Sequence, residues 1–227
     1  MKIAEIFYSI QGEGMLAGVP SAFIRTSGCN LRCTWCDTPY TSWQPEGEER
    51  TLDGMLADVR RNSPTHVVVT GGEPMLTEDI VPLTQRLREM ELHVTIETAG
   101  TVYQPLVCDL MSISPKLANS TPHSREGGRW AAQHDRLRYQ PRVLKKLMAE
   151  SPYQLKFVVC APDDLEEINK IVEETGADRG RVILMPEGTD AQAIYDRSRW
   201  LVDICKAEKY RYGPRLHIDL YGNQRGV

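Results

Sequence analysis

The chain has 227 residues, of which 41% are apolar and 26% are charged, as in an ordinary globular protein. Its formal net charge is −4, so the composition gives no electrostatic reason to expect nucleic-acid binding. No apolar run approaches the roughly 18 residues that cross a bilayer, and Glu5 interrupts the short apolar run at the amino terminus, unlike a secretory signal. We therefore expect a cytoplasmic protein that binds neither a membrane nor nucleic acid.

Short apolar segments rich in β-branched residues alternate with helical patterns along the chain. In chain order, the predicted strands are Ser21–Ser27, Thr65–Gly71, Leu92–Thr98, Leu110–Ser114, Gln154–Cys160, Arg181–Pro186 and Arg215–Tyr221. The predicted helices begin at Thr51, at Thr77, at Asp163 or Asp164 (ending at Gly176), and at Asp190. Several strands are continuously apolar, which is typical of a parallel sheet covered on both faces. The alternation predicts an α/β fold with mostly parallel strands, either curved into a partial barrel or open and doubly wound.

Unusual short motifs follow the predicted strands. In chain order they are "TSGCN", "TGGEP", "ETAG", "SPK" and "MPEG". Right-handed crossovers place the carboxyl ends of parallel strands on one side of a sheet, where ligands bind. We therefore expect these motifs to form a single site.

One segment breaks the alternation. Residues 118–141, "ANSTPHSREGGRWAAQHDRLRYQP", are polar and have no clear period, which predicts an irregular insertion that is either disordered or functional, for example as a lid. Three of its side chains are interpreted as surface residues: His123, His134 and Trp130. The histidines in strand-like stretches are interpreted as structural: His66, His93 and His217. No linker divides the chain, so we expect one domain over residues 1–227.

Three of the six cysteines lie within eight residues, in "CNLRCTWCDT". Cys29, Cys33 and Cys36 are reduced thiols suited to metal or catalysis, because no signal peptide argues for disulfides. Zinc would need a fourth ligand, and Asp37 is awkwardly placed for that role. An iron–sulfur cubane normally takes four thiolates, so three would leave one iron open. The other cysteines, Cys108, Cys160 and Cys205, are expected to be small buried hydrophobic residues.

The C-x3-C-x2-C pattern after a strand resembles the radical S-adenosylmethionine enzymes. The resemblance implies a partial, incomplete TIM-like barrel of that type, with a 4Fe-4S cluster whose open iron chelates S-adenosylmethionine and whose electron releases a 5′-deoxyadenosyl radical. "TGGEP" resembles the superfamily's GGE element, in which glycines permit close backbone approach and Glu73 would hold the cofactor's amine.

Further motifs narrow the resemblance. "SIQGEG", "GVPSAFIRTSGCNLRCTWCDT", "ETAGTVY" and the terminal "LYGNQRGV" closely resemble the 7-carboxy-7-deazaguanine synthases. Members of that family are lyases that convert 6-carboxy-5,6,7,8-tetrahydropterin into 7-carboxy-7-deazaguanine with loss of ammonia, in queuosine-type deazapurine biosynthesis. The motifs run from one end of the chain to the other, so they are more specific than the cysteine loop alone.

The resemblance also implies residue roles. The substrate-binding residues would be Ile10, Gln11, Gly12, Arg25, Thr70 and Val227. The cofactor-binding residues would be Trp35, Cys36, Asp37, Gly72, Glu73, Ser114, Pro115, Lys116, Met185, Pro186, Glu187 and Gly188. The catalytic set would be Cys29, Cys33, Cys36 and Thr38, in which the hydroxyl of Thr38 is the protein's ligand to Mg²⁺. The alternative role for Thr38 is a helix N-cap, and for Val227 a frayed terminus.

Two other functions remain open at this stage. A glycyl-radical activating enzyme would share the cysteine loop but act on a protein, and it would not be expected to carry "SIQGEG" or "GNQRGV". A non-catalytic iron–sulfur electron-transfer protein would be expected to supply a fourth ligand, which is missing here, and it would have no use for "TGGEP". For the deazaguanine synthase, we expect a low-potential electron donor of the flavodoxin or ferredoxin type, and a homodimer as in relatives.

Overall fold

One mixed sheet runs through the computed structural model, which describes residues 1–227. Its strand order is β3-β1-β2-β4-β5-β6-β7-β8-β9. The strands are β1 Lys2–Ile10, β2 Pro20–Thr26, β3 Glu48–Glu49, β4 His66–Gly71, β5 His93–Thr98, β6 Leu110–Ile113, β7 Tyr153–Val159, β8 Val182–Pro186 and β9 Arg211–Tyr212. β1 is antiparallel to both its neighbours, and every pairing from β2 to β9 is parallel.

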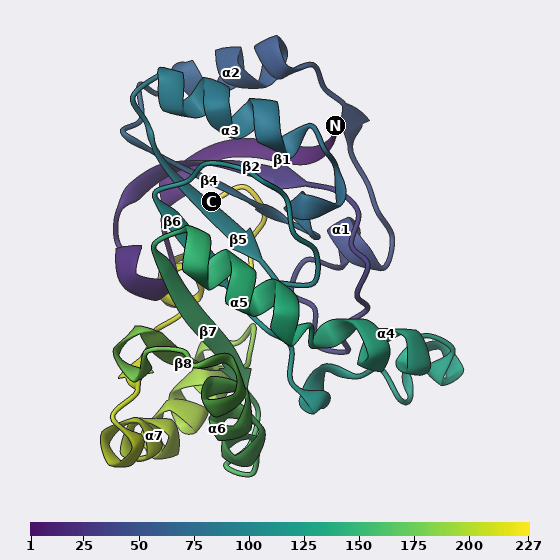
Figure 1. Ribbon diagram of the computed structural model, residues 1–227, viewed down its shortest axis with the longest axis vertical. Coiled ribbons are helices and arrows are strands. Elements are labelled where there is room, and N and C mark those ends of the chain that lie inside the picture. Colours follow the sequence, from purple (N-terminus) through teal and green to yellow (C-terminus); the bar gives the residue numbers. More distant parts are fainter.

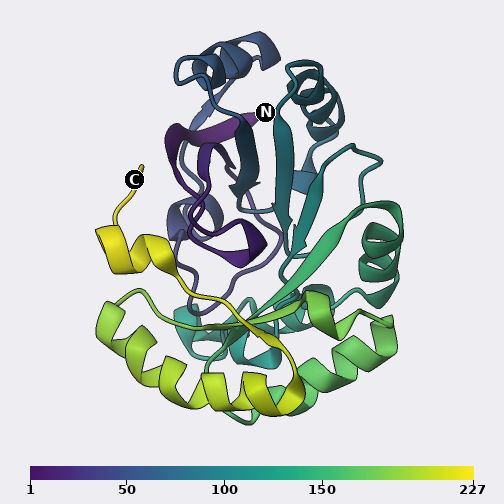
Figure 2. The ribbon, with the colours of Figure 1, turned by 90° about the vertical axis from the view of Figure 1, so that its left-hand side faces the viewer.

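The larger helices lie along the outer side of this curved sheet (Figures 1 and 2). The helices are α1 Pro39–Ser42, α2 Leu52–Arg60, α3 Ile80–Glu89, α4 Ala131–Arg138, α5 Pro141–Glu150, α6 Asp164–Thr175, α7 Ala191–Glu208 and α8 Leu216–Tyr221. Alternate residues of the strands, such as Ile24, Val69 and Ile96, are completely buried in the apolar core beneath them. The intervening strand residues face the inner side, where the sheet can present polar groups. No helix combines the length and the apolar character that a membrane crossing needs.

Six of the seven predicted strands are confirmed to within a residue or two, but the prediction for Arg215–Tyr221 is wrong. This segment forms α8, whose backbone bonds are local: Ile218 N–H and Asp219 N–H both donate to the Arg215 carbonyl. The apolar alternation of the segment suggested a strand. The sheet already ends at the two-residue β9, and within α8 Ile218 is the one buried residue. The predictions also missed β1, whose alternation is broken by polar residues.

The helix starts are mostly as predicted. The Thr51 hydroxyl caps α2 by accepting the Gly54 N–H at 3.2 Å, and α6 ends at Gly176 with φ of 71°. α3 begins at Ile80, three residues later than the start predicted at Thr77. Pro82 therefore lies in the first turn of the helix, where its missing N–H leaves no bond unmade.

Residues 118–141 are more regular than predicted. They contain two short 3-10 turns, Ala118–Ser120 and Arg125–Gly128, followed by α4. The interpretation of His134 as a surface residue is wrong, because its side chain is 1% exposed. The segment is ordered by polar contacts and a few buried side chains, which leave no apolar period in its sequence.

Candidate active site

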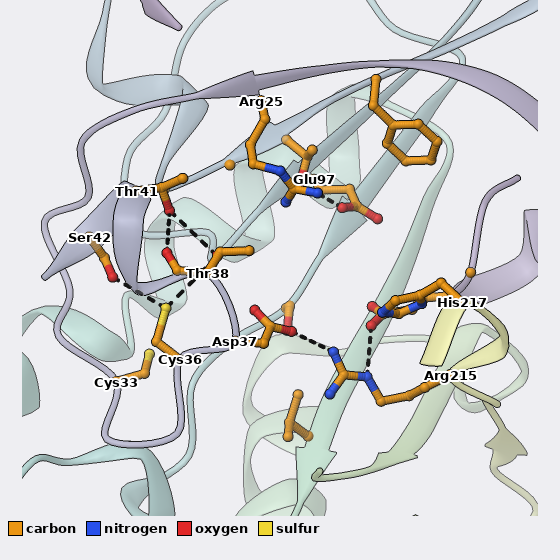
Figure 3. A pocket seen from close by; sticks show the side chains of 18 of the residues that line it. Arg25, Cys33, Cys36, Asp37, Thr38, Thr41, Ser42, Glu97, Arg215 and His217 are labelled. Carbon is orange, nitrogen blue, oxygen red and sulfur yellow. Dashed lines mark hydrogen bonds and ion pairs between the residues drawn. The ribbon is translucent and has the colours of Figure 1, made fainter. Parts of the chain in front are cut away.

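A cavity of about 470 Å³ opens on the inner side of the sheet, at the carboxyl ends of the parallel strands. Figure 3 shows that β2, the cysteine loop after it, β5 and the carboxyl-terminal segment all direct side chains into it. The expected convergence of the motifs on one site is therefore seen in the structure.

A polar row crosses the sheet beneath this cavity. The strand register pairs Arg25 with Thr70, and Glu97 with Ser112. The Thr70 hydroxyl donates to Glu97 at 2.7 Å, which joins the two pairs into one row across β2, β4, β5 and β6. Because side chains alternate along a strand, each of these residues faces the cavity while its neighbours enter the core. The row gives the cavity a cation at one end and a carboxylate at its centre.

Arg25 is held in place from behind. Its Nε donates to Glu5 at 2.7 Å, and Glu5 also accepts from the Tyr40 hydroxyl at 2.8 Å. The guanidinium carbon lies 5.4 Å from the ring centre of Phe7, which itself stacks on Phe23. With Nε engaged, the two terminal nitrogens form a fork that suits a planar carboxylate.

The three cysteines of the loop line the cavity. The Leu31 N–H donates to the Cys29 sulfur at 3.4 Å, and the Ser42 hydroxyl lies 3.2 Å from the Cys36 sulfur. Burial raises the pKa of Cys29 to about 12 and also raises that of Cys33. A bound metal overcomes such shifts, since a coordinating thiol is deprotonated.

This donor set fits an iron–sulfur cluster. A single zinc ion would hold every sulfur at about 2.3 Å. The three thiols are not arranged around one point in that way. A cubane gives each thiolate its own iron, and hydrogen bonds to the sulfurs tune its potential. The three cysteines, with their N–H and hydroxyl partners, are therefore the residues that would hold the cluster.

The glycines of "TGGEP" fit this loop closely. A Cβ on Gly72 would lie 2.0 Å from the Gly28 carbonyl oxygen, and one on Gly71 would lie 2.2 Å from the Thr26 carbonyl oxygen. Gly71 also has a φ of +123°, which favours glycine. We expected these glycines to let the backbone come close to a ligand. In the structure they also let the backbone at the end of β4 pack closely against the chain that leads from β2 into the cysteine loop.

A buried charge network forms the opposite wall. Arg215 donates through one terminal nitrogen to Asp37 (Figure 3). It also donates through Nε to Glu13 at 3.1 Å and through the other terminal nitrogen to the Gly188 carbonyl. Lys156 bridges Glu13 at 3.0 Å and Glu97 at 3.1 Å. The network therefore links the cysteine loop to the polar row.

Burial and neighbouring charges shift the pKa values of Glu13, Asp37, Lys156 and His217. Burial favours the neutral form of Glu13, but Lys156 and Arg215 outweigh it and hold the carboxyl pKa far below its usual value. Burial likewise opposes ionisation of Asp37, yet Arg215 lowers its pKa. Burial would lower the pKa of Lys156, but Glu97 and Glu13 raise it. Burial lowers the pKa of His217, so its imidazole is neutral.

Most of the sequence-predicted site residues line the cavity. They are Ile10, Gln11, Gly12, Arg25, Cys29, Cys33, Trp35, Cys36, Asp37, Thr38, Thr70, Gly72, Ser114, Lys116, Met185, Glu187 and Val227. Lys116 donates to the Ser114 hydroxyl at 2.7 Å, which orders "SPK". The Thr38 hydroxyl caps no helix N–H.

Four predicted residues do not line the cavity: Glu73, Pro115, Pro186 and Gly188. Glu73 is 2% exposed and accepts bonds from Thr98 at 2.8 Å and the Ala99 N–H at 2.9 Å. In this structure its carboxylate braces the turn after β5. Gly188 takes part through its carbonyl, which accepts from Arg215.

Sequence reasoning missed five residues of the site: Glu13, Glu97, Lys156, Arg215 and His217. A signal existed for two of them, because Glu97 and Lys156 are charged residues inside otherwise apolar strands, and such residues are rarely buried without a partner. His217, interpreted as structural, lines the cavity, and its ring packs against Gly12: a Cβ there would lie 2.0 Å from His217 Nδ1.

Comparison with known proteins identifies the class. The model of the Radical SAM superfamily matches residues 23–120. Among solved structures, the chain is similar to QueE from Escherichia coli, with a TM-score of 0.69 and 26% identity over 93% of this chain and 92% of that one. Streptococcus suis SuiB bound to S-adenosylmethionine shares the fold, with a TM-score of 0.53 and 14% identity over 81% of this chain and 47% of that one. The fold and the cysteine loop are thus those of a radical SAM enzyme.

Curated relatives narrow the class to a family. The chain is 44% identical to a 7-carboxy-7-deazaguanine synthase of Rhodopirellula baltica, over 99% of this chain and 88% of the relative. It is also 44% identical to a 7-carboxy-7-deazaguanine synthase of Halobacterium salinarum, over 98% of this chain and 91% of that relative. The chain belongs to the 7-carboxy-7-deazaguanine synthase family. The predicted mostly parallel α/β fold and the predicted family are confirmed, and the superfamily implies a 4Fe-4S cluster and S-adenosylmethionine.

Proposed function

We propose that this chain converts 6-carboxy-5,6,7,8-tetrahydropterin into 7-carboxy-7-deazaguanine with release of ammonia. The observation that carries the proposal is the common cavity: the three-cysteine loop and the polar row Arg25, Thr70 and Glu97 open on the same space of about 470 Å³. A cluster with S-adenosylmethionine supplies, when bound, a carbon radical that removes a hydrogen atom from the substrate. The protein's task is to hold the pterin beside it.

We propose an orientation for the substrate from the side chains that line the cavity. The free fork of Arg25 meets the pterin carboxylate, and Thr70 lies next to it in the row. The carboxylates of Glu97 and Glu13, which both lie beside Lys156, accept from the N–H groups of the pyrimidine ring. The neutral imidazole of His217 can accept a proton or donate one at the edge of the same ring.

The cofactor's place follows from the other side of the cavity. Ser114 and Lys116 hold its ribose and carboxylate, and Met185 and Glu187 border its adenine. Arg197 fixes Glu187 by donating to its carbonyl at 2.9 Å and to its carboxylate at 3.1 Å. Asp37 stays engaged with Arg215 at the wall of the cavity. These contacts orient the cofactor.

The hydroxyl of Thr38 is the protein's single ligand to Mg²⁺ in this proposal. It faces the cavity, and Thr41 Oγ1 lies 3.4 Å from its oxygen. Magnesium requires six oxygens at about 2.1 Å and keeps waters readily, so one hydroxyl cannot hold it alone. We expect weak Mg²⁺ binding without substrate and tighter binding with it. Stoichiometric, tight uptake by the substrate-free enzyme in calorimetry would contradict this role.

Anaerobic turnover tests the proposed function. The reconstituted enzyme, reduced with dithionite and supplied with S-adenosylmethionine and the tetrahydropterin, should form a product with the mass and ultraviolet spectrum of 7-carboxy-7-deazaguanine, and ammonia in equal amount. If the enzyme instead generates a glycyl radical on an added protein, or cleaves no pterin, the proposal is wrong.

A further inference from the structure

A strongly basic segment lies outside the cavity. Residues 118–146, called here the basic segment, contain seven arginines and lysines against two acidic residues, a net charge of +5 in a chain whose total is −4. Figure 1 shows its helix α4 projecting from the body of the protein, and none of its residues lines the cavity. The proposed reaction gives this segment no role.

The basic segment packs directly on the cysteine loop. The Thr34 N–H donates to the Ser120 carbonyl at 2.8 Å, and the Arg32 N–H donates to His134 Nδ1 at 3.0 Å. His134 Nε2 in turn lies 2.8 Å from the Ser120 hydroxyl. Leu137 of α4 packs against the small apolar cluster that contains Leu31 and Cys33 of the loop. These contacts fix the segment against the outer side of the loop, opposite the cavity.

Aromatic rings hold several of its cations in place. The Arg125 guanidinium lies 3.8 Å from the ring centre of Trp43, and Trp43 donates to the Cys33 carbonyl at 2.9 Å. Arg129 of the segment lies 5.3 Å from the ring centre of Trp130, and Arg32 of the cysteine loop lies 5.0 Å from the same ring centre. Rings and arginines of this kind are the groups that dominate the affinity of protein interfaces. Their side chains are already ordered, so binding a partner costs less conformational entropy.

We propose that the basic segment is the docking surface for an acidic, low-potential electron-carrier protein of the flavodoxin or ferredoxin class. This proposal rests on the proposed function, which requires one electron per radical: the carrier is oxidised by one electron, and the cluster held by the three cysteines is reduced by it. Substrate and cofactor occupy the cavity side of the loop, so the carrier must approach from the outer side. That side carries the +5 segment, whose charge complements an acidic carrier.

Two exposed arginines of the segment allow a matched test. The variant R129E/R136E changes the charge by −4 on the segment. The control R199E/R211E makes the same change at an exposed arginine of α7, a helix that lies away from α4 in Figure 1, and at an exposed arginine of the edge strand β9. Neither pair contacts the cavity. Calorimetry with an acidic flavodoxin measures binding to each cluster-loaded enzyme, and stopped-flow absorbance measures cluster reduction by the flavodoxin hydroquinone.

We expect R129E/R136E to weaken flavodoxin binding and slow reduction by about tenfold or more, because charge steering raises association rates by orders of magnitude. The control should change by less than about twofold. The wild-type affinity should also fall from about 0.01 M to about 1 M salt, as the screening length shrinks from about 30 Å to about 3 Å. Dithionite-driven turnover should be the same in all three proteins.

Equal effects of the two variants, or no effect of R129E/R136E on binding and reduction, would overturn the docking surface. So would tight binding of transfer RNA that R129E/R136E abolishes while flavodoxin binding persists. Loss of dithionite-driven product in the wild type would instead refute the proposed function. The two failures are therefore distinguishable.

Discussion

Replacing Arg215 with methionine should strongly destabilise the protein, because this arginine compensates two carboxylates. Its side chain is 8% exposed, and it binds Glu13, whose side chain is 17% exposed, at 3.1 Å. Removing one partner of a buried ion pair costs about 3–5 kcal/mol, since the other charge stays buried without compensation. The ion pair with Asp37 contributes less to the loss of stability, because the Asp37 side chain is 39% exposed and water screens its charge. Lys156 remains beside Glu13, so we expect the lower end, about 3 kcal/mol.

Thermal unfolding of Arg215→Met measures this loss. For a chain of this length, about 3 kcal/mol corresponds to a decrease of roughly 6–12 °C in Tm. The matched control is Arg199→Met, an exposed arginine of α7 that should shift Tm by only a degree or so.

The loss should depend on pH. Glu13 and Asp37 have folded-state pKa values below their ordinary ones. Their contribution to stability is therefore present above the unfolded-state pKa of about 4 and disappears as pH falls through the folded-state values. The gap between wild type and Arg215→Met should be largest near pH 7 and shrink below about pH 4. A variant as stable as the Arg199→Met control at pH 7, or a gap that grows on acidification, would refute the reasoning.

Three further predictions concern the substrate end and the basic segment. Arg25→Lys keeps the positive charge but loses the two-pronged guanidinium. Losing a charge-assisted hydrogen bond of about 1.5 kcal/mol or more should raise the KM for the pterin about tenfold or more. An unchanged KM in steady-state assays would contradict this prediction. Adding two residues after Val227, which lines the cavity while Arg225 pairs with Glu46 at 2.8 Å, should raise KM, and turnover unaffected by the extension would remove the terminus from the site. Burial lowers the pKa of His134 to about 4. The free energy of unfolding should therefore fall as pH decreases from about 6.5 toward 4, by about 1–2 kcal/mol at pH 5. Urea unfolding of His134→Gln should show a smaller fall, and the same dependence of unfolding free energy on pH in both proteins would contradict this prediction.

Local patterns predicted the parallel core and the part of the site that follows each strand. Continuous apolar runs such as Val67–Val69 are completely or almost completely buried, and "TSGCN" and "TGGEP" do lie together. Arg215 and Glu13 are separated by 202 positions, so nothing local joins them. α8 was mistaken for a strand because six residues carry too short a pattern to separate a helix from a strand. His134 gave no apolar signal because it is buried by polar contacts.

The cysteine loop carries the central claim, that three thiolates hold a cluster with one open iron. Metal and sulfide analysis of the anaerobically purified protein, followed by reduction in the presence of S-adenosylmethionine, tests it most directly. We predict about four iron and four sulfide per chain, with 5′-deoxyadenosine and methionine released on reduction, and loss of both cluster and cleavage in Cys36→Ala. Zinc in place of iron and sulfide, or S-adenosylmethionine left intact by the reduced protein, would contradict the account.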